Sequence, residues 1–153
     1  MSASHTYRFF QFTLRPAGSI ATDLLLAQQW TAADPWHCST VDPTFWLVQQ
    51  LRCDSYLLLD QEGPLFFWRG VFKDRSIEMH IQFPPTPGER MERQRLRRRV
   101  RAGLLVGLTW LEGMLRKIGI EEIYFESVSP KLIDFCTHHL KFAQEGQRIS
   151  KRI

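Results

Sequence analysis

Alternating and helical hydrophobic patterns divide the first half of the chain into short elements. Residues 7–14 alternate and are rich in aromatic side chains, which predicts a strand. Apolar residues at helical spacing predict a helix over 19–33 with Ser19 as its N-cap, and a shorter helix over 44–52. Turn residues at 61–63 and 73–75 separate three predicted antiparallel strands, which cover residues 55–60, 64–72 and 76–83.

One long helical pattern dominates the second half. Its apolar stripe recurs at spacings of three and four, at Val100, Leu104, Leu108, Leu111, Leu115 and Ile118. Gly119 predicts the end of this helix, and residues 86–94 before it are predicted to be a loop. Ser129 and Pro130 mark the start of another helix. The remaining predicted elements are a strand over 120–128, a helix over 129–142, and a final strand over 142–153 with a turn at Glu145–Gly146.

This order of elements predicts an α/β (α+β) fold with a mixed, mostly antiparallel central sheet flanked by helices. No repeat or linker divides the chain, so residues 1–153 are expected to form a single domain. The N-terminus lacks a signal-peptide pattern, and the longest apolar run, residues 102–111, is too short to span a bilayer. We therefore expect a cytoplasmic protein with no membrane partner. The edge of the last strand is compatible with a monomer or a homodimer.

The positive charge of the chain is concentrated in one segment. Seven arginines fall within residues 90–101, and outside this segment acidic residues slightly outnumber basic ones. The net charge of +4 is therefore a patch. Such a patch favours a localised anionic partner, such as the pyrophosphate of a cofactor, over a nucleic acid. The three cysteines, Cys38, Cys53 and Cys136, are widely spaced, which predicts reduced thiols and no metal site.

Three segments, taken with the order of elements, resemble the GNAT superfamily of acyl-CoA-dependent N-acyltransferases. "SIEMHIQFPP" (76–85) is similar to the strand beside the pantetheine arm, and "RRRVRAGLLVGLTWL" (97–111) to the pyrophosphate loop and its helix. "IYFESVSPKLIDFCTHHLKFAQEG" (123–146) is similar to the next strand and helix. The resemblance implies a GNAT-like acyl-CoA N-acyltransferase fold. It also implies an N-acetyltransferase with acetyl-CoA as co-substrate and an amine of a small molecule or protein as acceptor.

The resemblance places the cofactor at the start of the long helix. Unpaired N–H groups at a helix start bind phosphate, and arginines add charge-assisted hydrogen bonds. The family pattern Gln/Arg-x-x-Gly-x-Gly/Ala aligns with residues 97–102 or 98–103, and neither alignment has the middle glycine. The residues implied to bind the cofactor are Ile81, Gln82, Phe83, Arg97, Arg98, Arg99, Val100, Arg101, Ala102, Gly103, Ser129 and Phe135.

The candidate base and acid follow from the same comparison. Alternation places Glu78 and His80 on one face of strand 76–83, where either can take a proton from an amine, and Glu126 can join them. Family members often protonate the leaving thiolate with a tyrosine, whose position falls here on Cys136 or Thr137. Cys136 is therefore the candidate acid. The aromatic residues Trp36 and Trp46 are expected to wall the acceptor pocket.

Two alternatives stay open. The missing glycine and tyrosine favour a catalytically silent GNAT-like module with a binding or structural role. The arginines of residues 90–101 favour a nucleic-acid-binding domain, although the chain lacks the paired aromatic residues of a single-strand platform. Cofactor affinity separates the enzyme from a module that binds none, and a steep salt dependence of binding identifies a nucleic-acid partner.

Overall fold

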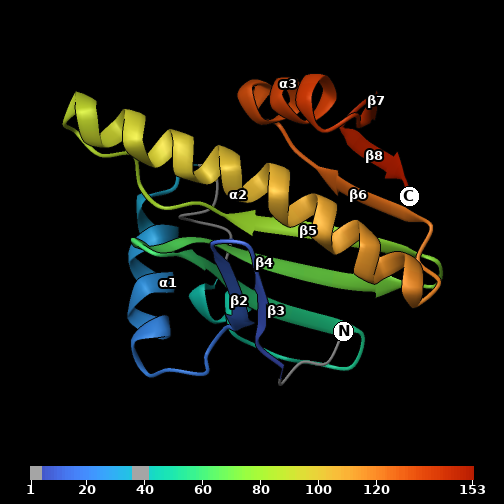
Figure 1. Ribbon diagram of the computed structural model, residues 1–153, viewed down its shortest axis with the longest axis horizontal. Helices are drawn as coiled ribbons and strands as arrows, with labels where there is room; N and C mark the ends of the chain where they lie inside the picture. Colours follow the sequence, from blue (N-terminus) through green and yellow to red (C-terminus); the bar gives the residue numbers. More distant parts are fainter. Residues whose placement is uncertain (1–4, 36–41) are drawn as a thin grey trace.

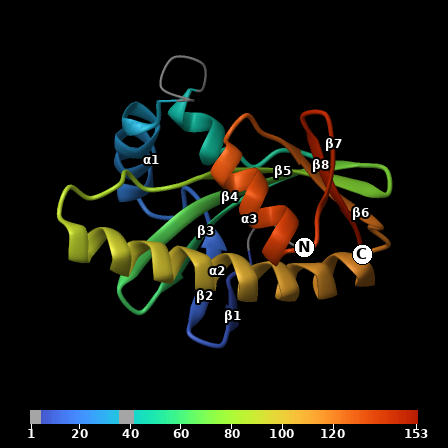
Figure 2. The ribbon, with the colours of Figure 1, turned by 90° about the horizontal axis from the view of Figure 1, so that it is seen from above.

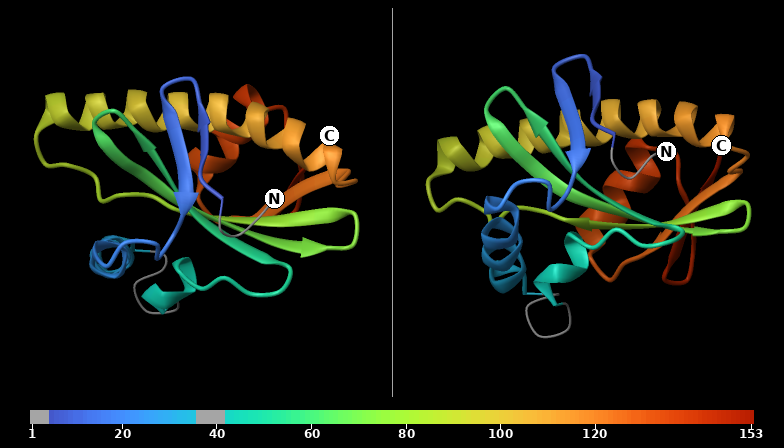
Figure 3. Two further views of the ribbon diagram at one scale, coloured as in Figure 1. Left: turned by 60° about the horizontal axis from the view of Figure 1, so that its bottom comes forward. Right: turned by 90° about the horizontal axis from the view of Figure 1, so that it is seen from below.

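The computed structural model describes residues 5–35 and 42–153, and within them an open eight-stranded sheet has helices on both faces (Figure 1). The strands lie in the order β1-β2-β3-β4-β5-β6-β8-β7. All neighbouring strands pair antiparallel except β5 and β6, which pair parallel. The helices α2 and α3 cover one face, and α1 and η1 cover the other (Figure 3). The predicted mixed, mostly antiparallel sheet flanked by helices is confirmed.

The first half of the chain contains more turns than its sequence predicts. The single strand predicted over 7–14 is wrong, because Phe10 takes a positive φ of 51° and divides it into a hairpin. Ser19 is not the N-cap of the first helix, which follows Ala21, and the predicted helix over 44–52 is only one short 3-10 helix. The elements are β1 (Tyr7–Phe9), β2 (Phe12–Pro16), α1 (Thr22–Ala33), η1 (Pro43–Trp46), β3 (Cys53–Asp60), β4 (Gly63–Lys73) and β5 (Ser76–Gln82).

The second half follows its predicted order closely. Gly119 has a φ of 81° just after the long helix, and the Ser129 side chain accepts a hydrogen bond from the Leu132 N–H as an N-cap. The turn at Glu145–Gly146 divides the last segment into two strands. The elements are α2 (Arg90–Lys117), β6 (Glu122–Glu126), α3 (Pro130–His139), β7 (Ala143–Glu145) and β8 (Arg148–Arg152). None of the helices in the described ranges is long and apolar enough to cross a membrane.

The start of α2 corrects the sequence analysis. The loop predicted over 86–94 is confirmed for residues 86–89 and wrong for residues 90–94, because the helix begins at Arg90 and its first turns consist of strong helix formers. The Glu89 side chain accepts hydrogen bonds from the Met91 and Glu92 N–H groups at 2.8 and 2.7 Å. A carboxylate therefore already caps this helix end. Residues 97–103 lie inside the helix, where N–H groups are used by helical carbonyls.

Two of the α2 arginines hold the helix to the turn between β3 and β4. Arg99 donates to both carboxylate oxygens of Asp60, Nε to Oδ2 at 2.8 Å and Nη2 to Oδ1 at 2.7 Å. Arg95 pairs with Glu62 in the same turn. These ion pairs hold the N-terminal half of α2 against the β3–β4 turn, so Arg95 and Arg99 have structural partners.

The Asp60–Arg99 pair should make the free energy of unfolding depend on pH in the acidic range. The Arg99 guanidinium lowers the pKa of Asp60 below its usual value, so the pair stabilises the fold above about pH 4 and is lost as the pH falls further. Asp60→Asn should lower the free energy of unfolding by about 1–2 kcal/mol at pH 7 and by less at pH 3. Urea unfolding at both pH values measures this. Asp74→Asn, in an exposed turn, is the control. A loss that is equal at both pH values would contradict the assignment.

The larger apolar core lies between the sheet and the helices α2 and α3. The helix α2 approaches the sheet most closely at Gly103, where an added Cβ would lie 3.0 Å from Leu58 Cδ2 and 3.2 Å from Leu65 Cδ1. Gly103 therefore serves helix packing. A smaller core lies under α1 and η1 and contains Ala17, Ala27, Trp30, Trp46, Leu57 and Phe67.

The parallel pair β5–β6 separates soon after it begins. Its register covers only three residue pairs, which are Ser76–Glu122, Ile77–Ile123 and Glu78–Tyr124. Beyond Glu78, β5 continues along β4 and β6 continues along β8. In Figure 2, α3 lies over this region and runs from the end of β6 toward the middle of α2. The sheet is therefore split between β5 and β6, under α2 and α3.

Candidate active site

A cavity of about 310 Å³ lies at the split between β5 and β6. Met79 and Ile81 line it from the α2 side of the sheet, whereas Phe45 and Trp46 line it from η1 on the opposite side. The cavity therefore connects the two faces of the sheet. Trp46 was expected to wall an acceptor pocket, and it does line this cavity; Trp36 lies outside the described residues.

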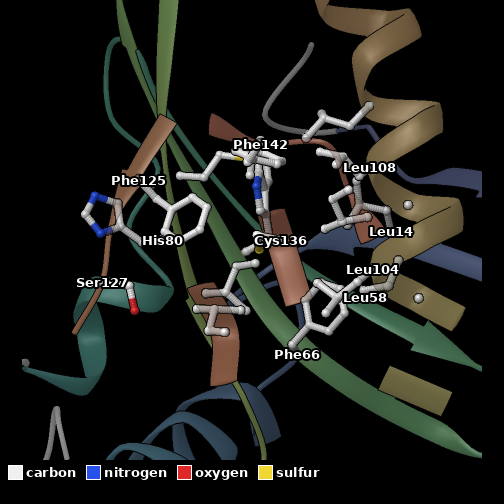
Figure 4. Close-up of a pocket in the computed structure, with 18 of the residues that line it drawn as sticks. Leu14, Leu58, Phe66, His80, Leu104, Leu108, Phe125, Ser127, Cys136 and Phe142 are labelled. Carbon is white, nitrogen blue, oxygen red and sulfur yellow. The ribbon is translucent and has the colours of Figure 1, made fainter. Parts of the chain in front are cut away.

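His80 lies at the polar side of the cavity (Figure 4). Its Nε2 is 3.3 Å from Glu78 Oε1, and its ring packs edge-on against Phe45 with centroids 5.4 Å apart. The His80 side chain is 35% exposed, which leaves it open to a substrate. Glu126 and Ser127, at the end of β6, line the same part of the cavity. The predicted common face of Glu78 and His80 is confirmed.

Glu78 is held by cations and a hydroxyl group. Lys73 forms an ion pair with it, and the Tyr124 hydroxyl donates to Glu78 Oε2 at 3.2 Å. Burial acts to raise the pKa of Glu78, but Lys73, His80 and Tyr124 together lower it below its usual value. A carboxylate with a lowered pKa is a weak base. This electrostatic environment suits Glu78 to orient His80, and leaves His80 as the better proton acceptor.

Cys136 lies in the wall of the cavity, on α3. Burial raises the pKa of its thiol to about 12, well above the value near 8.5 of a free thiol. The thiol stays protonated at neutral pH, but it is a weak acid. Its surroundings favour a role in lining the cavity. Its catalytic role stays a prediction.

The arginines that were implied to bind the cofactor fall into separate groups on α2. Arg99 is engaged with Asp60, whereas Arg97 and Arg98 are exposed on the helix surface. Arg101 reaches α3, where its guanidinium lies 5.8 Å from the centre of the Phe135 ring and its Nη2 lies 3.5 Å from His139 Nδ1. The structure therefore brings Arg101 and Phe135 together. Val100 and Ala102 pack against the larger core.

The strand residues implied to bind the cofactor also lie in different surroundings. Ile81 lines the cavity, but Gln82 is fully buried and donates to Asp34 Oδ2 at 2.9 Å, which gives it a structural contact with the end of α1. Phe83 packs against Phe66 with centroids 5.8 Å apart. Ser129 caps α3.

Several lining residues were missed by the sequence analysis. They come from distant elements, and their sequence patterns indicate only a place in the core. These residues are Phe9, Leu14, Phe45, Gly107 and Leu132. Gly107 alone had a signal, because a glycine inside a helix is costly and often marks close packing or a site.

Known proteins match this chain in structure and not in sequence. Comparison with protein-family models gives no match, and no curated protein matches significantly. A probable GNAT-family acetyltransferase from Chromobacterium violaceum matches with a TM-score of 0.63 and 13% identity, over 99% of this chain and 93% of that one. PaiA N-acetyltransferase from Thermoplasma acidophilum, solved in complex with coenzyme A, matches with a TM-score of 0.56 and 12% identity, over 94% and 100%.

A third neighbour is the ribosomal-protein-S18-alanine N-acetyltransferase from Escherichia coli. It matches with a TM-score of 0.59 and 16% identity, over 93% of this chain and 94% of that one. At such identities the likeness establishes the fold. The GNAT resemblance predicted from the sequence is confirmed at that level.

Proposed function

We propose that this chain, which has the fold of GNAT acetyltransferases, is an N-acetyltransferase that uses acetyl-CoA. The observation that carries the proposal is the cavity at the split between β5 and β6, with His80 and Glu78 beside it. One structural neighbour was solved with coenzyme A, and another acts on an alanine of a ribosomal protein. The proposed acceptor is therefore an amine of a small molecule or of a protein.

In the proposed step, His80 takes a proton from the acceptor amine. The amine nitrogen attacks the thioester carbonyl carbon, a C–N bond forms, the C–S bond breaks, and the thiolate leaves. Solvent gives one proton to the thiolate and takes one from His80, so that amine and thioester become amide and thiol. Glu78 holds the imidazole and stabilises its positive charge. The cavity orients the two reactants, which supplies much of the rate in direct transfer.

The pyrophosphate requires a different explanation from the one that the sequence suggested. The N–H groups at the start of α2 are capped by Glu89, so backbone donors are taken there. Arg97 and Arg101 lie one helical turn apart, and Arg101 reaches α3 beside Phe135. We assign phosphate binding to these two guanidinium groups, which form strong hydrogen bonds with phosphate oxygens.

This assignment predicts the effect of removing both charges. Arg97→Ala combined with Arg101→Ala should weaken acetyl-CoA binding by about 10- to 100-fold, since each lost charged hydrogen bond costs about 1.5–3 kcal/mol and partial compensation is expected. Isothermal titration measures the affinity. Arg116→Ala, near the other end of α2, is the matched control and should bind as the wild type does. Unchanged affinity in the double variant would exclude this phosphate site.

The same titration tests the two alternative functions. A catalytically silent module that binds cofactor would show acetyl-CoA affinity without transfer to any amine. A nucleic-acid-binding domain is favoured by one observation, the exposed arginines of α2, among them Arg90, Arg97 and Arg98. That function predicts binding of a short RNA with a steep salt dependence, and no effect of acetyl-CoA.

A further inference from the structure

The cavity is larger than an acetyl group requires. Its volume is about 310 Å³, whereas an apolar cavity of about 150 Å³ is enough to hold benzene. An acetyl group brings one methyl and one carbonyl group. With the thioester and the acceptor amine at the His80 side of the cavity, the side lined by Leu14, Leu58 and Leu108 has no occupant in simple acetyl transfer.

The cavity also runs far from the reacting groups. Phe125 and Ser127 line it at the end of β6, and Leu14 lines it on β2. Four strand spacings separate β6 from β2 in the sheet order, and neighbouring strands lie about 4.8 Å apart. The lining residues therefore extend across roughly 19 Å of the sheet beneath α2.

The two ends of the cavity differ in character. In Figure 4, His80 and Ser127 lie on one side, whereas Leu14, Leu58 and Leu108 lie together on the other, beside α2. The leucine side offers no partner for a polar ligand, and such apolar cavities exclude water. A hydrocarbon chain matches the leucine side of this lining.

We propose that the leucine side of the cavity holds the hydrocarbon chain of an acyl group longer than acetyl, so that the preferred donor is a medium-chain acyl thioester. The inference rests on the proposed function, because the chain enters as part of the transferred acyl group. The bonds formed and broken are those of the acetyl reaction. Each buried methylene of the chain should increase affinity by about fourfold, less what is lost in ordering it.

Gly107 gives direct experimental access to the chain site. It lines the cavity from α2, and an added Cβ would lie 3.9 Å from Leu58 Cδ2, an ordinary contact. A leucine at this position would fit the helix and place its side chain in the cavity. Gly113 lies on the same helix, has nothing within 4 Å of an added Cβ, and does not line the cavity. Gly113→Leu is therefore a matched control for Gly107→Leu.

The experiment compares acetyl-CoA, decanoyl-CoA and free 1-decanol on the wild type and both variants. Binding is followed by titration calorimetry, and melting temperatures confirm that each variant folds. We expect the wild type to bind decanoyl-CoA at least tenfold more tightly than acetyl-CoA. Gly107→Leu should remove this preference and the binding of decanol. Gly113→Leu should keep all three affinities.

The outcomes separate this inference from the proposed function. Equal affinity of the wild type for both thioesters would overturn the chain site and leave acetyl transfer standing. Decanol binding that Gly107→Leu abolishes, with neither thioester bound, would support the chain site and overturn the proposed function. A preference for decanoyl-CoA that survives in Gly107→Leu would overturn the placement beneath α2.

Discussion

Replacing His80 by glutamine is expected to lower kcat by about 10²–10⁴-fold, the range that a positioned general base contributes. Glutamine keeps a polar side chain beside Phe45 but cannot take a proton from the amine. Acetyl-CoA affinity should stay unchanged, because His80 packs against Phe45 of η1, on the face of the sheet opposite α2 and its arginines. Single-turnover acyl transfer, measured beside titration with acetyl-CoA, separates these two effects.

Glu78→Gln distinguishes the base from the residue that positions it. With the amide at position 78, His80 keeps a hydrogen-bond partner and loses a negative charge, so the loss of kcat should be smaller than in His80→Gln. A larger loss in Glu78→Gln than in His80→Gln would make the carboxylate the base. The wild-type kcat/KM should also fall in acid, because a protonated imidazole cannot accept a proton, and His80→Gln should flatten that decline.

Replacing Arg69 by leucine is expected to cost about 3–4 kcal/mol of stability and to lower Tm by about 10 °C. Arg69 on β4 is 5% exposed, and its Nη1 lies within hydrogen-bond distance of three oxygen atoms. These are Phe45 O at 2.6 Å, Val48 O at 2.7 Å and Ser55 Oγ at 2.9 Å. Leucine would leave these buried acceptors without their charged donor. The cost of such unmade hydrogen bonds is larger than the gain from an apolar side chain.

Arg69 also carries a functional consequence. Its guanidinium lies 4.4 Å from the centre of the Phe45 ring, and Phe45 is the wall against which His80 packs. The Arg69 variant should therefore lose activity at temperatures where it is still folded. Arg75→Leu, which removes a surface pair with Glu121, is the control and should cost under about 1 kcal/mol. A Tm for Arg69→Leu within 2 °C of that control would contradict the structural role given to Arg69.

The strand order near the site was predictable because turn chemistry and alternation agree there. Gly63 has a φ of 125° and Asp74 a φ of 52°, so the residues at both turns take conformations that those turns require. After the second turn, alternation places Glu78 and His80 on one face of β5. The hairpin at Phe10 was missed for the opposite reason, because an aromatic residue takes the positive φ and no turn residue marks it.

The cofactor region was predicted less well because local sequence signals conflict. The arginines of residues 90–101 suggested a phosphate loop, whereas each of them also favours a helix. The clamp between Arg99 and Asp60 joins residues 39 positions apart, and no local pattern reveals such a pair. The same limit applies to Tyr124 and Glu78, which meet only through the parallel register of β5 and β6.

The short parallel pairing of β5 and β6 has a consequence for how the protein folds. Strands β1 to β5 pair with sequence neighbours, whereas β6 must return across the whole of α2 to reach β5. Contacts with such long loops form slowly, so the antiparallel meander should assemble first and β6 should dock last. The site exists only after that docking step. Hydrogen exchange should therefore find the segment 122–152 opening as one cooperative unit, and an active-site ligand should slow its exchange selectively.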